Sequence, residues 1–562
     1  MAAMTLSEAT AHVTATDPRF ALTRAEVRGV ELPVFANAPT SLRDLQKIGR
    51  DVHAGRDYIV YEGERIGYDD WVEETWRVAA ALRGRFGVRP GDRVAVAMRN
   101  YPEYLTLLMA IPAIGAVVVM VNAWWTTEEL EYGFADSGAK LVFADGPRAE
   151  RIAPFADRLG LRTVWVRDAA PQGAETWRDI LAGTPEAAEP DAPIDPDDDF
   201  AIMYSSGSTG HPKGVILTHR GAISATYSWL MGFSLIPLMM EEPPAPKADR
   251  QTILLATPLF HITATHPCFL LSIPLGAKLV MMRKWDAEEA VRLVREEEVT
   301  RFLAVPTMAQ DLALAARRLD VDLPTLSNLG AGGAKRPPAQ VAEQQEALPG
   351  VAVASGYGMT ETNALGVGIQ GEDYLAKPNA AGRLYPPLQE IKIVDDEGGA
   401  LPTGEVGEIC LKSATAMRGY LNQPEATAET LREGWVHTGD LGWLDDEGYL
   451  TIVDRKKNII IRGGENISGL EVEAAIHRHP AVLEAAVFPA PDDRLGEVVG
   501  AQIRLREGAA LREDDLAAFL GDILAKFKIP ERIWWAEGPL LRGATDKIDR
   551  RAIARACLGA GS

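Results

Sequence analysis

A run of hydroxyl and glycine residues followed by a lysine is the part of the sequence best suited to chemistry. The segment Ser205–Gly214 reads SSGSTGHPKG and lies between two apolar stretches. Glycines let backbone N–H groups approach phosphate oxygens, hydroxyl groups add donors, and Lys213 adds positive charge. The strict pattern G-x-x-x-x-G-K-S/T is not met, since Pro212 precedes this lysine and Gly214 follows it. The composition therefore favours phosphate binding, with an ordinary polar surface loop as the alternative.

Alternating strands and helices must position this loop. Apolar, β-branched segments predict strands, and amphipathic segments between them predict helices. The strands fall at residues 91–100, 116–122, 140–145, 197–204, 251–260, 277–285 and 300–306, and the helices at 101–114, 126–139 and 288–299. Such alternation predicts parallel sheets that are covered on both faces. Residues 169–177, 184–199 and 238–251 carry no periodicity and are expected to be loops.

The chain of 562 residues is long enough for more than one domain. It carries 58 Lys and Arg against 79 Asp and Glu, a net charge of −21, and no basic concentration that would indicate nucleic-acid binding. The uncharged stretch Leu105–Thr127 is broken by Pro112 and Gly115, so we expect no membrane span. The three cysteines are far apart, and Glu8 stands where a signal peptide needs apolar residues, so we expect a reducing, cytoplasmic setting.

The complete loop string, YSSGSTGHPKGV, resembles the phosphate loop of the adenylate-forming enzymes, which include acyl-CoA synthetases, amino-acid-adenylating domains and beetle luciferases. Further segments resemble that family's motifs and follow in its order. They are PLFHITA (258–264), GYGMTET (356–362), WVHTGDLG (435–442), VDRKKNIIIRGGENIS (453–468) and RGATDKIDRR (542–551). The resemblance runs from about Gly91 or earlier to nearly the end of the chain. Six ordered motifs make agreement by chance very unlikely.

The resemblance implies a reaction in two halves. A carboxylic acid and MgATP give acyl-AMP and pyrophosphate, and the thiol of coenzyme A then displaces AMP. Glu361 would ligate Mg²⁺, a hard cation that prefers oxygen ligands. Thr360 would contact the α-phosphate, and Asp440 would accept hydrogen bonds from the ribose hydroxyls. The implied ATP and AMP site comprises Ser205, Ser206, Gly207, Ser208, Thr209, Gly210, Lys213, Gly332, Ala334, Gly356, Tyr357, Gly358, Met359, Asp440 and Arg455.

The C-terminal motifs imply a moving lid. Lys457 stands at the family's hinge position, about which the C-terminal domain turns between the half-reactions. Arg462, Gly463 and Gly464 would help to form the tunnel for coenzyme A. Lys547 would bridge the substrate carboxylate and the α-phosphate, offsetting the repulsion between two anions. Without the surrounding motif, a lysine in this position would be interpreted as solvated.

The acyl pocket is implied to include His261, Tyr227, Gly333 and Gly366, and His261 would also gate the reaction. The segment around His261 lacks the aspartate that pairs with an α-amino group, so an amino-acid substrate is disfavoured. The chain ends without a carrier domain, which favours free coenzyme A. Medium- or long-chain fatty acids and arylalkanoic acids both fit, and the sequence does not choose between them. An ordinary core role remains the alternative for His261.

The sequence departs from the family pattern at Asp546, at Gly543, where a hydroxyl residue is usual, and at Gly469, where proline is usual. The position before the C-terminal lysine is usually glycine, and here it is Asp546. Its side chain places a negative charge beside the catalytic cation, so slower adenylation is expected. Three alternatives to the ligase reaction stay open. They are a luciferase-like oxygenase, an acyl-AMP ligase that acylates a carrier protein, and a nucleotide-binding relative whose catalysis Asp546 impairs.

The resemblance implies a large N-terminal domain, residues 1–455, of two doubly wound α/β subdomains and a distorted β-barrel. A small mobile α+β domain, residues 456–562, would follow. The expected partners are a small carboxylic acid, ATP and coenzyme A, without nucleic acid. A homodimer is compatible with the sequence.

Overall fold

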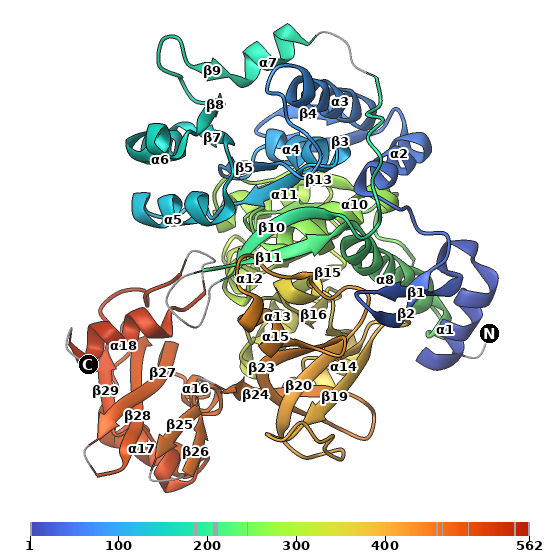
Figure 1. Cartoon of the computed structure of the whole chain (residues 1–562). Coiled ribbons are helices and arrows are strands. Elements are labelled where there is room, and N and C mark those ends of the chain that lie inside the picture. Colours follow the sequence, from blue (N-terminus) through green and yellow to red (C-terminus); the bar gives the residue numbers. More distant parts are fainter. Residues whose placement is uncertain are drawn as a thin grey trace.

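The computed structural model describes residues 3–184, 188–205, 212–243, 245–456, 459–462, 465–492, 494–543 and 547–559. It has a large N-terminal part and a small C-terminal part that lies to one side of it (Figure 1). The N-terminal part contains two large sheets, each mainly parallel, and the main hydrophobic core includes side chains from both of them. The α/β class and the division into a large and a small domain are confirmed.

The first large sheet has eight strands, and two of them flank the phosphate-loop motif. In spatial order they are β21 (Gly419–Tyr420), β11 (Lys213–Thr218), β10 (Asp199–Ser205), β6 (Val117–Met120), β5 (Arg93–Ala97), β7 (Leu141–Asp145), β8 (Arg162–Val166) and β9 (Glu175–Thr176). Strands β6 to β9 are parallel, but β10 and β11 form an antiparallel hairpin. The link between Ser205 and Lys213 is too short for the crossover that a parallel pair needs. The prediction of purely parallel sheets is wrong at this edge.

The second large sheet has nine strands. They are β18 (Arg383–Leu384), β17 (Val367–Gln370), β16 (Ala352–Tyr357), β15 (Asn328–Gly332), β14 (Arg301–Ala304), β12 (Thr252–Leu255), β13 (Lys278–Met281), β3 (Asp57–Tyr61) and β4 (Glu64–Gly67). The central strands from β16 to β3 are parallel, and antiparallel strands close both edges. Strand β3 joins this sheet although it precedes the whole first sheet in the chain, so the two sheets are built from interleaved segments.

Helices cover both sheets. They are α1 (Leu6–Thr16), α2 (Leu42–His53), α3 (Tyr68–Gly84), α4 (Pro102–Ala113), α5 (Thr127–Ser137), α6 (Gly146–Leu159), α7 (Trp177–Gly183), α8 (His219–Leu238), α9 (Ile262–Ala264), α10 (Leu271–Leu275), α11 (Ala287–Glu296), α12 (Pro306–Arg318), α13 (Pro338–Ala347), α14 (Gly371–Ala376) and α15 (Pro424–Thr430). A π-helix, Thr265–Leu270, links α9 to α10. Helix α4 is buried along its whole length. Over the described ranges, no helix is long and apolar enough to cross a membrane.

The rest of the chain forms two smaller sheets. One contains β19 (Glu390–Val394), β20 (Gly407–Lys412), β23 (Trp435–Leu444), β22 (Leu431–Arg432) and β24 (Leu450–Arg455), with antiparallel pairing throughout. The C-terminal sheet contains β26 (Glu465–Ser468), β25 (Ile459–Arg462), β28 (Gly496–Leu505), β27 (Val482–Asp492) and β29 (Arg532–Trp535). Helices α16 (Gly469–His477), α17 (Glu513–Gly521) and α18 (Arg550–Leu558) pack with it around their own core. A separate hairpin, β1 (Leu22–Val27) and β2 (Val30–Phe35), lies near the N-terminus.

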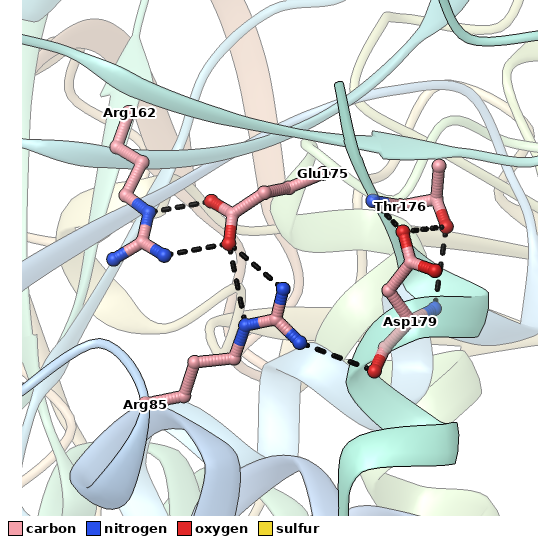
Figure 2. A network of polar contacts seen from close by, with 5 residues as sticks. All are labelled: Arg85, Arg162, Glu175, Thr176 and Asp179. Carbon is pink, nitrogen blue, oxygen red and sulfur yellow. Dashed lines mark hydrogen bonds and ion pairs between the residues drawn. The ribbon is translucent and has the colours of Figure 1, made fainter. Parts of the chain in front are cut away.

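The expected loop at residues 169–177 is partly ordered secondary structure. Strand β9 pairs with β8, and α7 starts at Trp177. Figure 2 shows why: the Glu175 carboxylate accepts hydrogen bonds from Arg85 and Arg162, while Thr176 and Asp179 form a capping box at the start of the helix. The contact with Arg85 joins residues 90 apart, so the sequence does not reveal it, whereas the capping box is a local pattern that the prediction overlooked.

Candidate active site

The candidate site lies where the carboxyl ends of β15 and β16 meet. The two strands are parallel, and Gly332 pairs with Gly356 in register at this edge. Ligands of open α/β sheets bind at the carboxyl ends of the strands. The predicted residues Gly333 and Ala334 follow β15 directly and are exposed. Tyr357 ends β16, and the segment to Thr362 follows it.

Lys547 reaches this edge from the C-terminal part of the chain. Gly333 has a φ of +77°, and a Cβ atom built on it would lie 3.1 Å from Lys547 Cε and 3.2 Å from Nζ. The positive φ favours glycine at this position, and a larger residue would also press on the end of the Lys547 side chain. Burial, together with the positive charge of Arg455, lowers the pKa of Lys547 to about 8, and the Asp440 carboxylate opposes the shift. The ammonium is thus held in a partly desolvated position facing the exposed loop.

Backbone and ion-pair contacts fix the segment that carries Lys547. Gly543 donates a backbone hydrogen bond to Lys547 O at 2.8 Å, and Asp549 N donates to Leu541 O at 2.9 Å. Arg550 Nε and Nη2 donate to the two oxygens of buried Glu473 at 2.7 and 2.6 Å. This bidentate pair joins the first turn of α18 to α16. Asp546, the departure from the family pattern, lies outside the described residues.

Asp440 is the centre of a second cluster. Its side chain is buried, and Oδ2 accepts a hydrogen bond from Tyr357 Oη at 2.8 Å. Oδ1 accepts one from Arg455 Nε at 3.1 Å, in keeping with the direct pairing of Asp440 with Arg455 between β23 and β24. Burial and the neighbouring Asp440 charge raise the pKa of Tyr357 well above its usual value. Each carboxylate oxygen has a second lone pair, so a carboxylate held in this way can also accept hydrogen bonds from the two hydroxyls of a ribose.

Glu361 is a buried carboxylate with an unusual neighbour. Its Oε1 accepts a hydrogen bond from Tyr420 Oη at 2.7 Å, and burial raises its pKa. No lysine or arginine in the described part of the chain forms an ion pair with it. Lys213 Nζ lies 4.7 Å from the centre of the Tyr420 ring, a cation–π contact. A desolvated carboxylate needs a positive partner, so this oxygen donor fits a hard divalent cation.

Tyr420 was not anticipated from the sequence. It lies on β21, a two-residue edge strand beside β11, and there it contacts both the expected phosphate-binding lysine and the expected metal ligand. Its position in RGYLNQPEAT carries no periodic or compositional signal. Only the pairing of β21 with β11 brings it beside Lys213.

Some of the remaining nucleotide-site residues lie near these clusters, and the others lie outside the described residues. Ser205 ends β10, directly before the undescribed residues Ser206, Gly207, Ser208, Thr209 and Gly210. Thr360 begins a short 3₁₀ turn, and Met359 is its N-cap. A Cβ atom on Gly358 would lie 2.1 Å from Ala364 O, so this turn closes tightly against its own backbone. The motif thus needs glycine for packing as well as for ligand approach.

The expected acyl-pocket residues do not all come together. His261 is the N-cap of α9, close to the Phe260 ring, and it precedes Thr263, whose Oγ1 lies 3.9 Å from a Cβ atom built on Gly333. A Cβ atom on Gly366 would lie 2.3 Å from Tyr357 O, so that glycine allows a close backbone approach.

Tyr227 is placed elsewhere, and its assignment to the pocket is corrected. Its ring packs against Phe20 and Phe35 in the N-terminal segment, with centroid distances of 6.3 and 5.9 Å. Helix α8 turns this side chain toward the N-terminal hairpin rather than toward the sheet edge. The sequence showed the helix but not which of its faces meets the site.

The two parts of the chain are also linked beside the expected hinge. Buried Asp454, at the end of β24, accepts hydrogen bonds from Ser468 Oγ at 3.0 Å and from Leu470 N at 3.1 Å. Ser468 is the N-cap of α16, so this contact joins the last strand of the N-terminal part to the first helix of the lid. Lys457, Gly463 and Gly464 lie outside the described residues. Arg462 forms an ion pair with Glu531 within the lid.

Family models match most of the chain. The AMP-binding enzyme model matches residues 49–421, and the AMP-binding enzyme C-terminal domain model matches residues 471–542. The two models meet the chain on opposite sides of the expected hinge.

Curated proteins and solved structures resemble nearly the whole chain. A feruloyl-CoA synthase from Amycolatopsis sp. is 34% identical over 495 residues, covering 86% of this chain and 94% of that protein. The long-chain-fatty-acid–CoA ligase FadD13 from Mycobacterium tuberculosis is 34% identical over 465 residues, covering 82% and 87%. The crystal structure of an anthranilate CoA ligase in complex with anthranoyl-AMP has a TM-score of 0.82 at 26% identity, covering 92% and 97%.

Proposed function

The chain belongs to the AMP-binding enzyme family, and we propose that the side chains around Lys547 carry out its acyl-CoA ligase reaction. The enzyme is an AMP-forming acyl-CoA ligase that uses a carboxylic acid, ATP and coenzyme A. The observation that supports the assignment of residues is the convergence of Lys547, Gly333 and the Asp440 cluster at one sheet edge. These residues are distant in the sequence.

In the first half-reaction, an oxygen of the substrate carboxylate attacks the α-phosphorus of ATP. The new oxygen–phosphorus bond forms as the bond to the bridging oxygen breaks, and pyrophosphate leaves with that electron pair. Two anions must approach, so a positioned cation between them lowers the barrier. Lys547 has that role, with Thr360 at the α-phosphate and Lys213 with the loop Ser205–Gly210 at the β- and γ-phosphates. Asp440 and Arg455 hold the ribose, and Tyr357 packs on the adenine beside Gly332, Ala334 and Gly356.

Mg²⁺ belongs to this proposal through Glu361. The carboxylate is an oxygen ligand held in place by Tyr420, which suits a cation that keeps most of its contacts to phosphate oxygens. When bound, the ion neutralises charge on the phosphates. Glu361 would orient it, and Tyr420 would orient Glu361.

In the second half-reaction, the sulfur of coenzyme A attacks the acyl carbon, the carbon–sulfur bond forms, and the bond to AMP breaks. We assign the domain boundary to 455/456 and the hinge to Lys457. The support is the change of sheet: β24 ends at Arg455 in the N-terminal part, and β25 starts at Ile459 in the lid. Rotation there would withdraw Lys547 and bring Arg462, Gly463 and Gly464 to the pantetheine. The Asp454–Ser468 contact would limit that rotation.

The acid is proposed to be a medium- or long-chain fatty acid or an arylalkanoic acid, with His261, Gly333 and Gly366 at the pocket entrance. Relatives named for feruloyl-CoA and for long-chain fatty acids support both classes. The test is pyrophosphate release with MgATP across a panel of both classes, with and without coenzyme A. Thioester and AMP formation with one class supports the proposal. Oxygen uptake would indicate a luciferase-like reaction, and transfer only to an added carrier protein would indicate an acyl-AMP ligase. A cytoplasmic location and a homodimer stay predictions, checked by cell fractionation and light scattering.

Replacing Asp440 by Asn should weaken nucleotide binding. The amide cannot accept two hydroxyls as a carboxylate does, and a hydrogen bond to a charged group contributes about 1.5–3 kcal/mol, or roughly 10- to 150-fold. We expect KM for ATP and Kd for AMP to rise by that factor, measured by pyrophosphate release and calorimetry. Tyr357→Phe is the matched control, because it removes the 2.8 Å contact but keeps the carboxylate. Equal nucleotide affinity in Asp440→Asn and the parent would contradict the assignment.

Replacing Asp546 by Gly should speed adenylation. At an effective dielectric constant of about 20, a like charge about 4 Å from a phosphate costs roughly 4 kcal/mol, and each 1.4 kcal/mol removed gives about tenfold in rate. Asp546→Asn separates the effect of charge from that of backbone freedom, since the amide keeps a side chain. The adenylation rate is measured by pyrophosphate exchange. An adenylation rate in Asp546→Gly no higher than that of the parent would contradict the hypothesis that Asp546 slows adenylation.

A further inference from the structure

Arg301 is a cation deep in the second large sheet with no described partner of opposite charge. It starts β14, which pairs with β15, the strand that ends directly before Gly333. Within the described ranges, it has neither an ion pair nor a recorded hydrogen bond to a side chain or carbonyl. Its guanidinium carbon lies 4.9 Å from the centre of the Phe233 ring. Burial lowers its pKa, and the groups that oppose this shift are the hydroxyl of Tyr385 and the thiol of Cys268.

The residues around Arg301 come from three elements that are distant in the sequence. Phe233 lies on α8, Cys268 on the π-helix that follows the His261 segment, and Tyr385 directly after β18. The Tyr385 hydroxyl rests on Gly368 of β17, 2.1 Å from where a Cβ atom would lie. Arg301, Phe233 and Tyr385 are only partly buried, although they pack among fully buried residues. Part of each of these side chains is therefore open to solvent or to a bound molecule.

A continuous strip of the sheet connects Arg301 to the reacting end. Arg301 pairs with Asn328 and Leu303 pairs with Gly330, so these residues share one face of adjacent parallel strands. A Cβ atom on Gly330 would meet Leu303 Cδ1 at 2.9 Å, and one on Gly332 would meet Thr263 Cγ2 at 3.9 Å. Gly332 lies four residues beyond Asn328, which is about 13 Å along the strand. This strip of the sheet therefore extends from near Lys547, past Gly330 and Leu303, to Arg301.

We infer that Arg301 is a specificity-determining residue, which selects acids that carry an oxygen acceptor at the end remote from the reacting carboxylate. The inference rests on the proposed function, because it takes Lys547 to bind the reacting carboxylate. A partly buried guanidinium without an acceptor is less well solvated than one in water, and a distal oxygen of the substrate would supply that acceptor. A site with an unpaired polar group rejects ligands that cannot pair with it. Two sources share this chemistry: an oxygen substituent on an aromatic ring, and the second carboxylate of a dicarboxylic acid.

The test compares acids that differ only at the far end. One pair is an arylpropenoic acid with and without a 4-hydroxy group, and the other is a straight-chain dicarboxylic acid and the monocarboxylic acid of equal length. Pyrophosphate release and thioester formation are measured for the parent, Arg301→Met and Arg301→Lys. The parent should prefer the oxygen-bearing member. Arg301→Met should lose that preference by roughly 10- to 150-fold, mainly through KM, while the plain acid is used as well or better.

The remaining comparisons distinguish a ring oxygen from a second carboxylate. They also distinguish a wrong inference about Arg301 from a wrong proposed function. If Arg301→Lys keeps a preference for the dicarboxylic acid only, the group that Arg301 binds is a carboxylate, because lysine can bind it as a point charge. Arg283→Met, at an exposed arginine after β13, is the matched control and should change neither ratio. Circular dichroism checks folding, and calorimetry with the acids gives the same comparison without turnover. A folded Arg301→Met with the parent's preference overturns the inference, whereas a parent that forms no thioester with any acid overturns the proposed function.

Discussion

Lys547→Ala should lower the rate of adenylation by roughly 1,000-fold, the upper range for loss of one positioned electrostatic stabiliser. The lysine sits against Gly333, where its ammonium can bridge the carboxylate and the α-phosphate. Pyrophosphate exchange measures this half-reaction. Thioester formation from chemically supplied acyl-AMP is the internal control and should change little, because the proposed rotation of the C-terminal domain would withdraw Lys547 before that step. A similar loss in both half-reactions would contradict the assignment.

The pH dependence gives a second measurement on the same residue. The lysine acts as a cation, and its pKa is lowered to about 8, so the charged form prevails below that pH. We therefore expect kcat/KM for adenylation to fall about tenfold per unit above pH 8. The folded state favours neutral lysine, so the parent loses stability as pH falls from the ordinary pKa of 10.5 through 8. Lys547→Met should lack that loss and unfold at no lower temperature at pH 7. A profile flat to pH 10 would contradict the role.

Glu361→Gln should reduce adenylation by roughly 100- to 1,000-fold and raise the Mg²⁺ concentration needed for half-maximal rate. The amide is a weaker ligand than a carboxylate for a hard cation. Because burial raises the pKa of Glu361, the neutral amide is tolerated by the fold, and the loss should appear in catalysis rather than in stability. Rates are measured across a series of Mg²⁺ concentrations.

Tyr420→Phe serves as the matched control for this site. It removes the hydroxyl that donates to Glu361 at 2.7 Å but keeps the ring beneath Lys213. We expect a smaller shift in the Mg²⁺ dependence, about tenfold or less, as for one hydrogen bond. An unchanged Mg²⁺ titration in Glu361→Gln would show that this carboxylate is not a metal ligand.

Local patterns in the sequence were sufficient for much of the fold. The alternation of β-branched and amphipathic segments predicted β5, α4, β6, α5 and β7 in order, because strand and helix periods depend on near neighbours. Ordered motifs identified the family, and with it the two-domain architecture. The pairing direction of β10 and β11 was missed, since the alternation shows that strands exist but not how they pair.

The sequence by itself determined the family, the reaction class and the residue types at each motif. Only the tertiary structure decided which side chains meet. Gly333 and Lys547 touch because the lid packs on the carboxyl edge of β15, and Tyr420 reaches Glu361 because β21 pairs with β11. Packing likewise places the Tyr227 ring against Phe35, and strand pairing places Arg301 beside Asn328. Strand order and helix rotation are set by packing over the whole core, and no local window of sequence carries that information.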